Sequence, residues 1–122
     1  MKLIDSNIIL YAGKEKFAHL RSLLTEEESV VSVVTIMETL GYHNITLEEK
    51  SFLEGVFTIL PSIPITTDIV VGVIKLRQRK NISLGDAIIA ATALDKKCVL
   101  YTRNTKDFKE IEGLEVVNPI DE

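Results

Sequence analysis

Four acidic residues stand in or beside apolar stretches of this 122-residue chain, where a carboxylate is costly or has no local explanation. They are Asp5, Glu38, Asp86 and Asp107. Acidic side chains are rarely buried unless they pair with a cation or coordinate a metal ion. If these four converge, they form an all-oxygen site of the kind that hard divalent cations prefer. A cation held there would acidify water and offset charge on phosphate oxygens, so the pattern indicates metal-assisted phosphodiester hydrolysis.

Each acid also has a simpler local explanation. Asp5 could cap the helix that follows it, Asp86 ends Ser83-Leu84-Gly85-Asp86, which resembles a capping box, and Asp107 could occupy a surface turn. Glu38 has the weakest alternative, because apolar residues precede it and no Lys or Arg stands nearby. The local explanations are independent of one another, whereas a shared site accounts for all four acids.

Other catalytic chemistries find little support in the sequence. His19 and His43 lack metal-ligand spacing and are interpreted as surface residues, and no Cys–His pair, Gly-x-Ser-x-Gly turn or glycine-rich phosphate loop is present. The single cysteine, Cys98, is expected in the core, which allows no internal disulfide and fits a reducing compartment. Asp5 interrupts the N-terminal apolar run too early for a signal peptide, so we expect a cytoplasmic protein.

Short apolar runs alternate with helical patterns along the chain. Strands are expected at residues 2–4, 30–31, 63–65, 99–101 and 115–117. Helices are expected at 7–12 and 15–24, and as a turn at 106–109. Four more are each expected to begin at a capping residue: from Ser32 to about 42, from Thr46 to about 59, from Thr67 to about 80, and from Ser83 to 96–97. The alternation predicts an α/β fold: a parallel sheet with helices on both faces, built as a single domain over residues 1–122.

Ligands bind beyond the carboxyl ends of the strands in such sheets. Asp5 ends the first strand, Asp107 follows the strand that ends near Thr102, and Asp86 opens a helix that faces the same edge in a right-handed crossover. Glu38 lies inside its helix and must reach sideways into the cleft. Topology therefore places three acids on one rim.

The net charge of −4 argues by itself against a nucleic-acid partner. The excess lies in residues 1–61, which hold five Lys or Arg and nine Asp or Glu, whereas residues 62–122 hold nine of each. Setting aside the four acids brings the net charge to zero. Five basic residues are candidates for contacts with phosphates of a nucleic acid: Lys75, Arg77, Arg79, Lys80 and Arg103. A helix end favoured by its dipole explains most of this cluster equally well.

Four segments, in order and spread over nearly the whole chain, resemble the PIN-domain ribonucleases, and most closely the VapC-type toxins of bacterial and archaeal toxin–antitoxin pairs. They are Leu3-Ile4-Asp5-Ser6-Asn7, Val31-Ser32 with Met37-Glu38, Leu84 to Ala93, and Leu100-Tyr101-Thr102-Arg103-Asn104-Thr105-Lys106-Asp107-Phe108. The resemblance implies a five-stranded parallel sheet, carboxylate-bound Mg²⁺ or Mn²⁺, and RNA as substrate. It also implies a homodimer and a cognate antitoxin that blocks the site.

The expected function is therefore a Mg²⁺- or Mn²⁺-dependent endoribonuclease, with Asp5, Glu38, Asp86 and Asp107 as metal ligands and catalytic residues. Asn7, Thr102 and Asn104 are candidates for orienting the carboxylates or water, although Asn7 could cap its helix and Thr102 could be a strand residue. Two alternatives remain: a catalytically inactive PIN-fold module that binds RNA or another partner, and a receiver-like phosphoacceptor domain of similar length.

Overall fold

The computed structural model describes residues 1–120, so the last two residues of the expected domain lie outside the described part. Five strands form one sheet of order β3-β2-β1-β4-β5, and every neighbouring pair is parallel. The strands are β1 (Lys2–Ile4), β2 (Ser29–Ser32), β3 (Ser62–Ile63), β4 (Val99–Tyr101) and β5 (Val116–Val117). The predicted parallel α/β sheet is confirmed. Its strand order differs from the 2-1-3-4-5 order of receiver domains, which removes that alternative.

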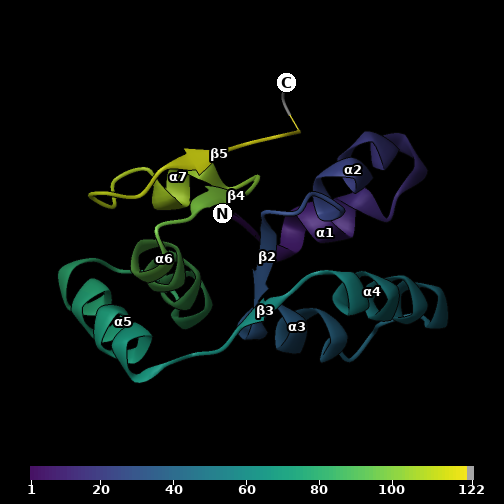
Figure 1. Cartoon of the computed structure of the whole chain (residues 1–122). Helices are drawn as coiled ribbons and strands as arrows, with labels where there is room; N and C mark the ends of the chain where they lie inside the picture. The colour runs from purple at the N-terminus through teal and green to yellow at the C-terminus, as the bar shows by residue number, and fades with distance from the viewer. Residues whose placement is uncertain (121–122) are drawn as a thin grey trace.

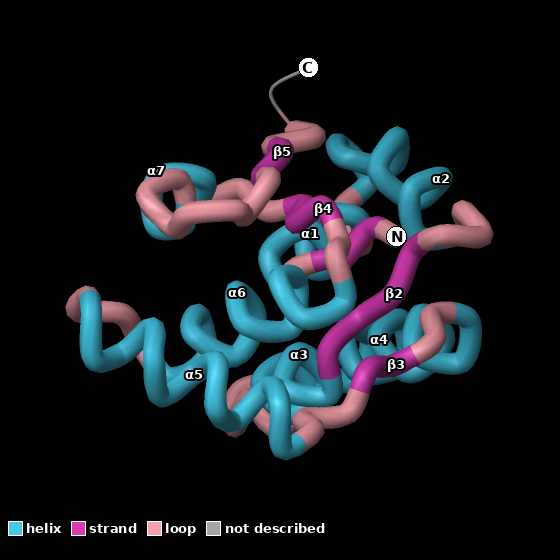
Figure 2. The backbone as a smooth tube through the Cα atoms, turned by 60° about the vertical axis from the view of Figure 1, so that its left-hand side comes forward, coloured by secondary structure: helices cyan, strands magenta, loops and turns pink. Residues whose placement is uncertain are grey.

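Helices connect successive strands and cover both faces of the sheet (Figures 1 and 2). They are α1 (Ser6–Ala12), the 3₁₀ helix η1 (Glu15–Leu20), α2 (Arg21–Leu24), α3 (Val33–Leu40), α4 (Leu47–Ile59), α5 (Thr67–Arg79), α6 (Leu84–Lys96) and α7 (Thr105–Phe108). None of the helices within residues 1–120 combines the length and apolar character that a membrane crossing needs.

Successive strand residues point to opposite faces of the sheet and divide the core in two. Leu3 and Val30 join the apolar cluster under α5, α6 and α7, whereas Ile4 and Val31 join the cluster under α1, α2 and α4. Figure 1 shows α5 and α6 on one side of the strands and α1, α2 and α4 on the other. The strand β1 is central and pairs with β2 and β4. Asp5, the residue that follows β1, therefore lies at the middle of the edge formed by the carboxyl ends of the strands.

Most predicted elements are confirmed to within a few residues, and three local predictions are corrected. The cap of α5 is Thr66, whose hydroxyl accepts from the Ile69 N–H, rather than Thr67. Residues 15–20 form a 3₁₀ helix because Phe17 leaves the helical region with φ −113°. The Ser83 box is half formed, because Ser83 Oγ accepts from the Asp86 N–H at 3.2 Å but no return bond joins the Asp86 carboxylate to the Ser83 N–H.

Candidate active site

Asp5 leaves the buried strand β1 at the carboxyl edge and caps α1. Its Oδ1 accepts from the Ser6 N–H at 2.8 Å, and its own N–H donates to the Tyr101 carbonyl of β4 at 3.0 Å. The side chain is only 5% exposed. The capping explanation for Asp5 is therefore correct for one oxygen and leaves the second oxygen for other contacts.

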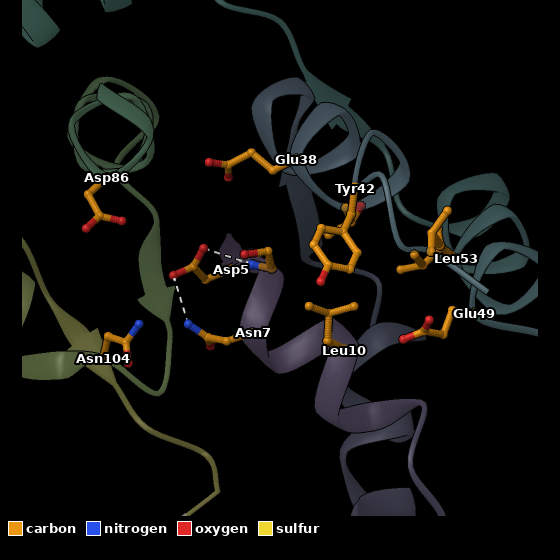
Figure 3. Close-up of a pocket in the computed structure, with 12 residues that line it drawn as sticks. Asp5, Asn7, Leu10, Glu38, Tyr42, Glu49, Leu53, Asp86 and Asn104 are labelled. Atoms are coloured by element: carbon orange, nitrogen blue, oxygen red, sulfur yellow. Dashed lines mark hydrogen bonds between the residues drawn. The ribbon is translucent and has the colours of Figure 1, made fainter. Parts of the chain in front are cut away.

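Thr102 and Asn7 hold that second oxygen. The buried Thr102 hydroxyl donates to Asp5 Oδ2 at 2.8 Å and accepts from Asn7 Nδ2 at 3.2 Å and the Asn104 N–H at 3.1 Å. A hydroxyl has one donor and two acceptor positions, so Thr102 is fully used. Asn7 Nδ2 also lies 3.4 Å from Asp5 Oδ2, and Asn7 Oδ1 accepts from the Arg103 N–H at 3.0 Å. The loop after β4 and the start of α1 are thus tied together through Asp5. Figure 3 shows the Asn7 side chain beside the Asp5 carboxylate.

Glu38 lies near the end of α3 and reaches across to α6. It reaches into the cleft as expected, because it lines a cavity, although the residue as a whole is exposed at the rim. Its carboxylate end rests against Gly85, where a Cβ would lie 2.6 Å from Glu38 Oε2. Only the missing side chain of Gly85 allows this approach, so α3 and α6 meet through the Glu38 carboxylate.

Asp86 lies in the first turn of α6, one residue beyond Gly85, and is partly exposed. Seven consecutive residues that follow it, from Ala87 to Ala93, are buried, as expected for a helix that is apolar on every side. The buried helix therefore fixes the position of Asp86 at the carboxyl edge of the sheet.

Three of the four predicted acids line one cavity of about 410 Å³: Asp5, Glu38 and Asp86. Figure 3 shows Glu38 and Asp86 extending toward Asp5 from different elements. Asp107 is exposed on α7 and is absent from the lining. Asn104, which directly precedes α7, lines the cavity instead. Asp107 still lies close enough for its charge to raise the pKa of Asp86.

The pKa values of Asp5, Glu38 and Asp86 are all raised. Burial raises the pKa of Asp5 most, Thr102 and Ser6 lower it, and the charge of Asp86 raises it again. The pKa of Glu38 is raised first by partial burial of its carboxylate and then by Asp5 and Asp86. Burial likewise raises the pKa of Asp86, against a lowering contact with Ser83. Burial is the largest cause of all three shifts, and the charge of a neighbouring acid adds to each: Asp86 for Asp5, Asp5 and Asp86 for Glu38, and Asp107 for Asp86.

The donor set fits a hard divalent cation. Ion pairs within residues 1–120 join Lys2 to Glu26 and Lys96 to Asp95, so none neutralises these acids. In the same range no three acidic, His or Cys side chains lie close enough to hold one ion together. Mg²⁺ commonly uses one or two carboxylates and keeps several waters, so carboxylates spread around a cavity suit it.

The predicted RNA-binding residues separate into two groups. Lys80 and Arg103 lie beside the site, because Lys80 Nζ donates to the Asp107 carbonyl at 3.4 Å and Arg103 follows Thr102. The Arg103 guanidinium sits 5.1 Å from the centre of the Tyr11 ring. Arg77 instead donates to the Ile82 carbonyl at 3.3 Å and faces the groove between α5 and α6.

The sequence reading missed the apolar end of the same cavity. Its lining side chains are Leu10 of α1, Tyr42 and Ile45 of the loop after α3, and Leu53 of α4. The one available signal was Tyr42, an aromatic residue four positions after Glu38 and just beyond the helix end.

The geometry agrees with the family comparison. The family model of the PIN domain matches residues 2–114. The chain belongs to the PIN-domain family. Similar PIN-domain proteins cover almost its whole length: Ribonuclease VapC1 of Rickettsia felis is 29% identical over 94% of this chain and 93% of that relative.

Solved structures are also similar to this chain over nearly its whole length. A chain of a toxin-antitoxin complex from Klebsiella pneumoniae is 32% identical, with a TM-score of 0.77 and coverage of 98% of both chains. A chain of VapBC-1 from nontypeable Haemophilus influenzae is 26% identical, with a TM-score of 0.75 and coverage of 96% of both chains. This PIN domain is therefore similar in sequence and fold to chains of these two complexes.

Proposed function

We propose that this PIN domain is a divalent-metal-dependent endoribonuclease and the toxin of a type II toxin–antitoxin pair. The observation that carries the proposal is the meeting of Asp5, Glu38 and Asp86, from three separate elements, around one cavity at the carboxyl edge of the sheet. Relatives that are similar over nearly the full length and named as ribonucleases support the reaction class.

In this proposal Asp5, Glu38, Asp86 and Asp107 hold Mg²⁺ or Mn²⁺, some of them through water. The bound ion would acidify a water molecule and offset negative charge on the phosphate. Thr102 and Asn7 keep Asp5 oriented, as their hydrogen bonds indicate, and Asn104 offers an amide at the cavity wall. Lys80 and Arg103 are placed to contact the RNA backbone beside the site, and Lys75, Arg77 and Arg79 extend that proposal along α5.

The charge of the cavity explains why a cation is needed. Its lining includes Asp5, Glu38, Glu49 and Asp86 and no Lys, Arg or His. A phosphate group entering such a cavity is repelled unless a cation stands between it and the carboxylates. Binding of the substrate phosphate and binding of the metal are therefore expected to depend on each other.

The proposed partners are a cognate antitoxin, as in the toxin–antitoxin complexes it resembles, and a second copy of the chain. An exposed apolar groove between α5 and α6, lined by Ile65, Val70, Ile74 and Leu84 among others, supports the homodimer. The lone buried Cys98 supports a reducing compartment, and we propose the cytoplasm.

A second function is an inactive PIN-fold module that binds RNA without cutting it. The separation of the carboxylates in the described residues, which keeps three of them from sharing an ion, is consistent with that module as well as with a Mg²⁺ site that keeps several waters. Cleavage and binding must therefore be measured separately.

The test is cleavage of total RNA by purified, antitoxin-free protein with Mg²⁺, Mn²⁺ or EDTA. We expect cleavage only with metal, and a loss of about a hundredfold or more in Asp5→Asn and in Asp86→Asn. Glu54→Gln is the matched control, because Glu54 is an exposed acid on α4 outside the cavity lining. Undiminished cleavage in EDTA would remove the metal from the mechanism, and RNA binding without cleavage would establish the inactive module.

A further inference from the structure

The cavity has two chemically different ends (Figure 3). One end carries Asp5, Glu38 and Asp86, and the other is walled by Leu10, Tyr42, Ile45 and Leu53. Its volume of about 410 Å³ falls in the range of roughly 300–1,000 Å³ that is usual for small-molecule sites. The acidic end alone does not use this space, so the apolar end needs an occupant.

Two large apolar side chains are left exposed at this end. Tyr42 is 53% exposed and Leu10 is 42% exposed, whereas Leu53 forms a buried floor at 1%. Exposed apolar surface that lines a concave site commonly marks a ligand contact. The Tyr42 ring lies 5.2 Å from the ring of His43, measured between centroids, and its hydroxyl makes no hydrogen bond within residues 1–120. The exposed part of the ring surface is therefore open to a ligand.

Tyr42 is held in place by its backbone. The Tyr42 N–H donates to the Thr39 carbonyl at 3.4 Å, and its carbonyl accepts from the Ile45 N–H at 3.1 Å. The preceding Gly41 ends α3 so tightly that a Cβ there would lie 2.4 Å from the Met37 carbonyl oxygen. The backbone from which the ring projects is therefore restrained, four residues beyond Glu38.

The lining disfavours an anionic occupant at the apolar end. Glu49 borders the apolar end, and no basic side chain lines any part of the cavity, so a second phosphate is disfavoured there. A nucleotide whose phosphate meets the acidic end carries its base on the adjoining sugar, which brings a neutral aromatic ring to the adjoining apolar end. Single-stranded RNA is commonly bound by stacking its bases on aromatic side chains.

We propose that the apolar end is a nucleobase subsite, in which Tyr42 stacks on the base of a nucleotide next to the scissile phosphate while Leu10 and Leu53 enclose its edge. This proposal rests on the ribonuclease function proposed above and adds a residue that positions the substrate. A stacked base is worth roughly five- to 150-fold in binding, so Tyr42 would contribute to which phosphodiester bond is cut.

The test compares two oligoribonucleotides built around the bond that the wild-type protein cuts: one intact, and one with an abasic sugar at the neighbouring nucleotide, tried on each side in turn. Wild type, Tyr42→Ala and Tyr42→Phe are assayed on both, with Met37→Ala as the control, because Met37 is an exposed apolar residue of α3 outside the cavity lining. Binding of the same oligonucleotides to Asp5→Asn and to Asp5→Asn/Tyr42→Ala gives a readout that needs no cleavage.

We expect Tyr42→Ala to raise KM for the intact substrate by roughly five- to 150-fold and to have little effect on one abasic substrate, while Tyr42→Phe and Met37→Ala behave like wild type. In the binding measurements, Asp5→Asn/Tyr42→Ala should likewise bind the intact oligonucleotide more weakly than Asp5→Asn does, and the two proteins should bind that abasic oligonucleotide about equally. Equal losses on intact and abasic RNA, or no loss in Tyr42→Ala, would overturn the subsite.

The two proposals can fail separately. Absence of cleavage by wild type, together with base-dependent binding that Tyr42→Ala removes, would refute the nuclease and keep the subsite. Cleavage that is indifferent to Tyr42 would refute the subsite and keep the nuclease. A Tyr42→Ala variant that weakens only antitoxin binding would assign the apolar end to a protein contact and would also overturn the nucleobase proposal.

Discussion

At the scale of single residues, Asp5 is a buried carboxylate whose donors are all neutral: the Ser6 N–H, the Thr102 hydroxyl and the Asn7 amide. Burial of an acid in this way is unfavourable, and these bonds offset only part of the cost, since the pKa of Asp5 remains raised. The Thr102 hydroxyl is the strongest of the influences that lower this pKa. Thr102 is therefore the residue on which the ionised form of Asp5 most depends.

Thr102→Val tests this dependence, because valine keeps the shape of threonine and removes its hydroxyl. We expect a loss of about 1–3 kcal/mol in the free energy of unfolding at neutral pH, since Asp5, Asn7 and the Asn104 N–H each lose a partner. Urea unfolding of wild type, Thr102→Val and Thr102→Ser measures it. Thr102→Ser keeps the hydroxyl and should recover most of the loss; a Thr102→Val protein as stable as wild type would contradict the role given to this hydroxyl.

At the scale of secondary-structure elements, α3 and α6 meet through a carboxylate and a glycine. Glu38 belongs to α3 and Gly85 to α6, and the close approach of Glu38 Oε2 leaves no room for a Cβ at Gly85. The atom that would clash is the far end of a flexible side chain, so the helices need not move apart. A substitution at Gly85 should displace the Glu38 carboxylate alone.

Gly85→Ala should therefore separate activity from stability. Displacement of a reacting group by about 1 Å can cost about a hundredfold in rate, so we expect a loss of that order in cleavage. Stability should stay unchanged or rise, because alanine in place of a helical glycine favours the helix by roughly 0.5–1 kcal/mol. The measurements are RNA cleavage rates and thermal melts.

Gly55→Ala is the matched control for this variant. Gly55 lies inside α4, and a Cβ there would meet nothing within 4 Å. It should show the same gain in stability with unchanged cleavage. Full activity in Gly85→Ala would mean that the position of the Glu38 carboxylate does not matter for the reaction.

At the scale of the whole molecule, the sheet holds mutually repelling acids at its carboxyl edge. This repulsion lowers the free energy of unfolding. The pKa values of Asp5, Glu38 and Asp86 are all raised on folding. An acid with a raised pKa binds its proton more tightly in the folded state than in the unfolded state. The stabilisation that this proton binding gives to the folded state is fully present below a pH of about 4 and is lost as the pH rises through the raised pKa values. Metal-free protein should thus lose stability over that window.

Asp86→Asn should reduce this loss in EDTA, because it removes one of the repelling charges, and its stability should match or exceed that of wild type at neutral pH. Saturating Mn²⁺ should make the wild type the more stable of the two proteins. A hundredfold excess over Kd stabilises the wild type by about 2.7 kcal/mol and should stabilise the variant by less. Thermal melts against pH, with Mn²⁺ and with EDTA, measure both effects. Destabilisation of Asp86→Asn in EDTA, with wild type indifferent to Mn²⁺, would leave Asp86 as part of the α6 cap alone.

The sequence by itself determined the parallel α/β fold, most element positions and the edge at which the acids gather. These features follow from local patterns: short apolar runs that alternate with helical periodicity, capping residues such as Ser32, Thr46 and Ser83, and the rule that parallel strands share one carboxyl edge. Asp5 could be placed with such rules because it directly follows the strand β1.

Only the tertiary structure decided how far each side chain reaches. Glu38 lines the cavity from an exposed position at its rim, and Asp107 lies outside the cavity lining, because both positions depend on the packing of helices that local sequence does not specify. The contact between Glu38 and Gly85, and the meeting of Leu10, Tyr42 and Leu53, join segments far apart in the chain. Such contacts arise when the helices on the two faces pack against the sheet, so periodicity, which describes one element at a time, does not contain them.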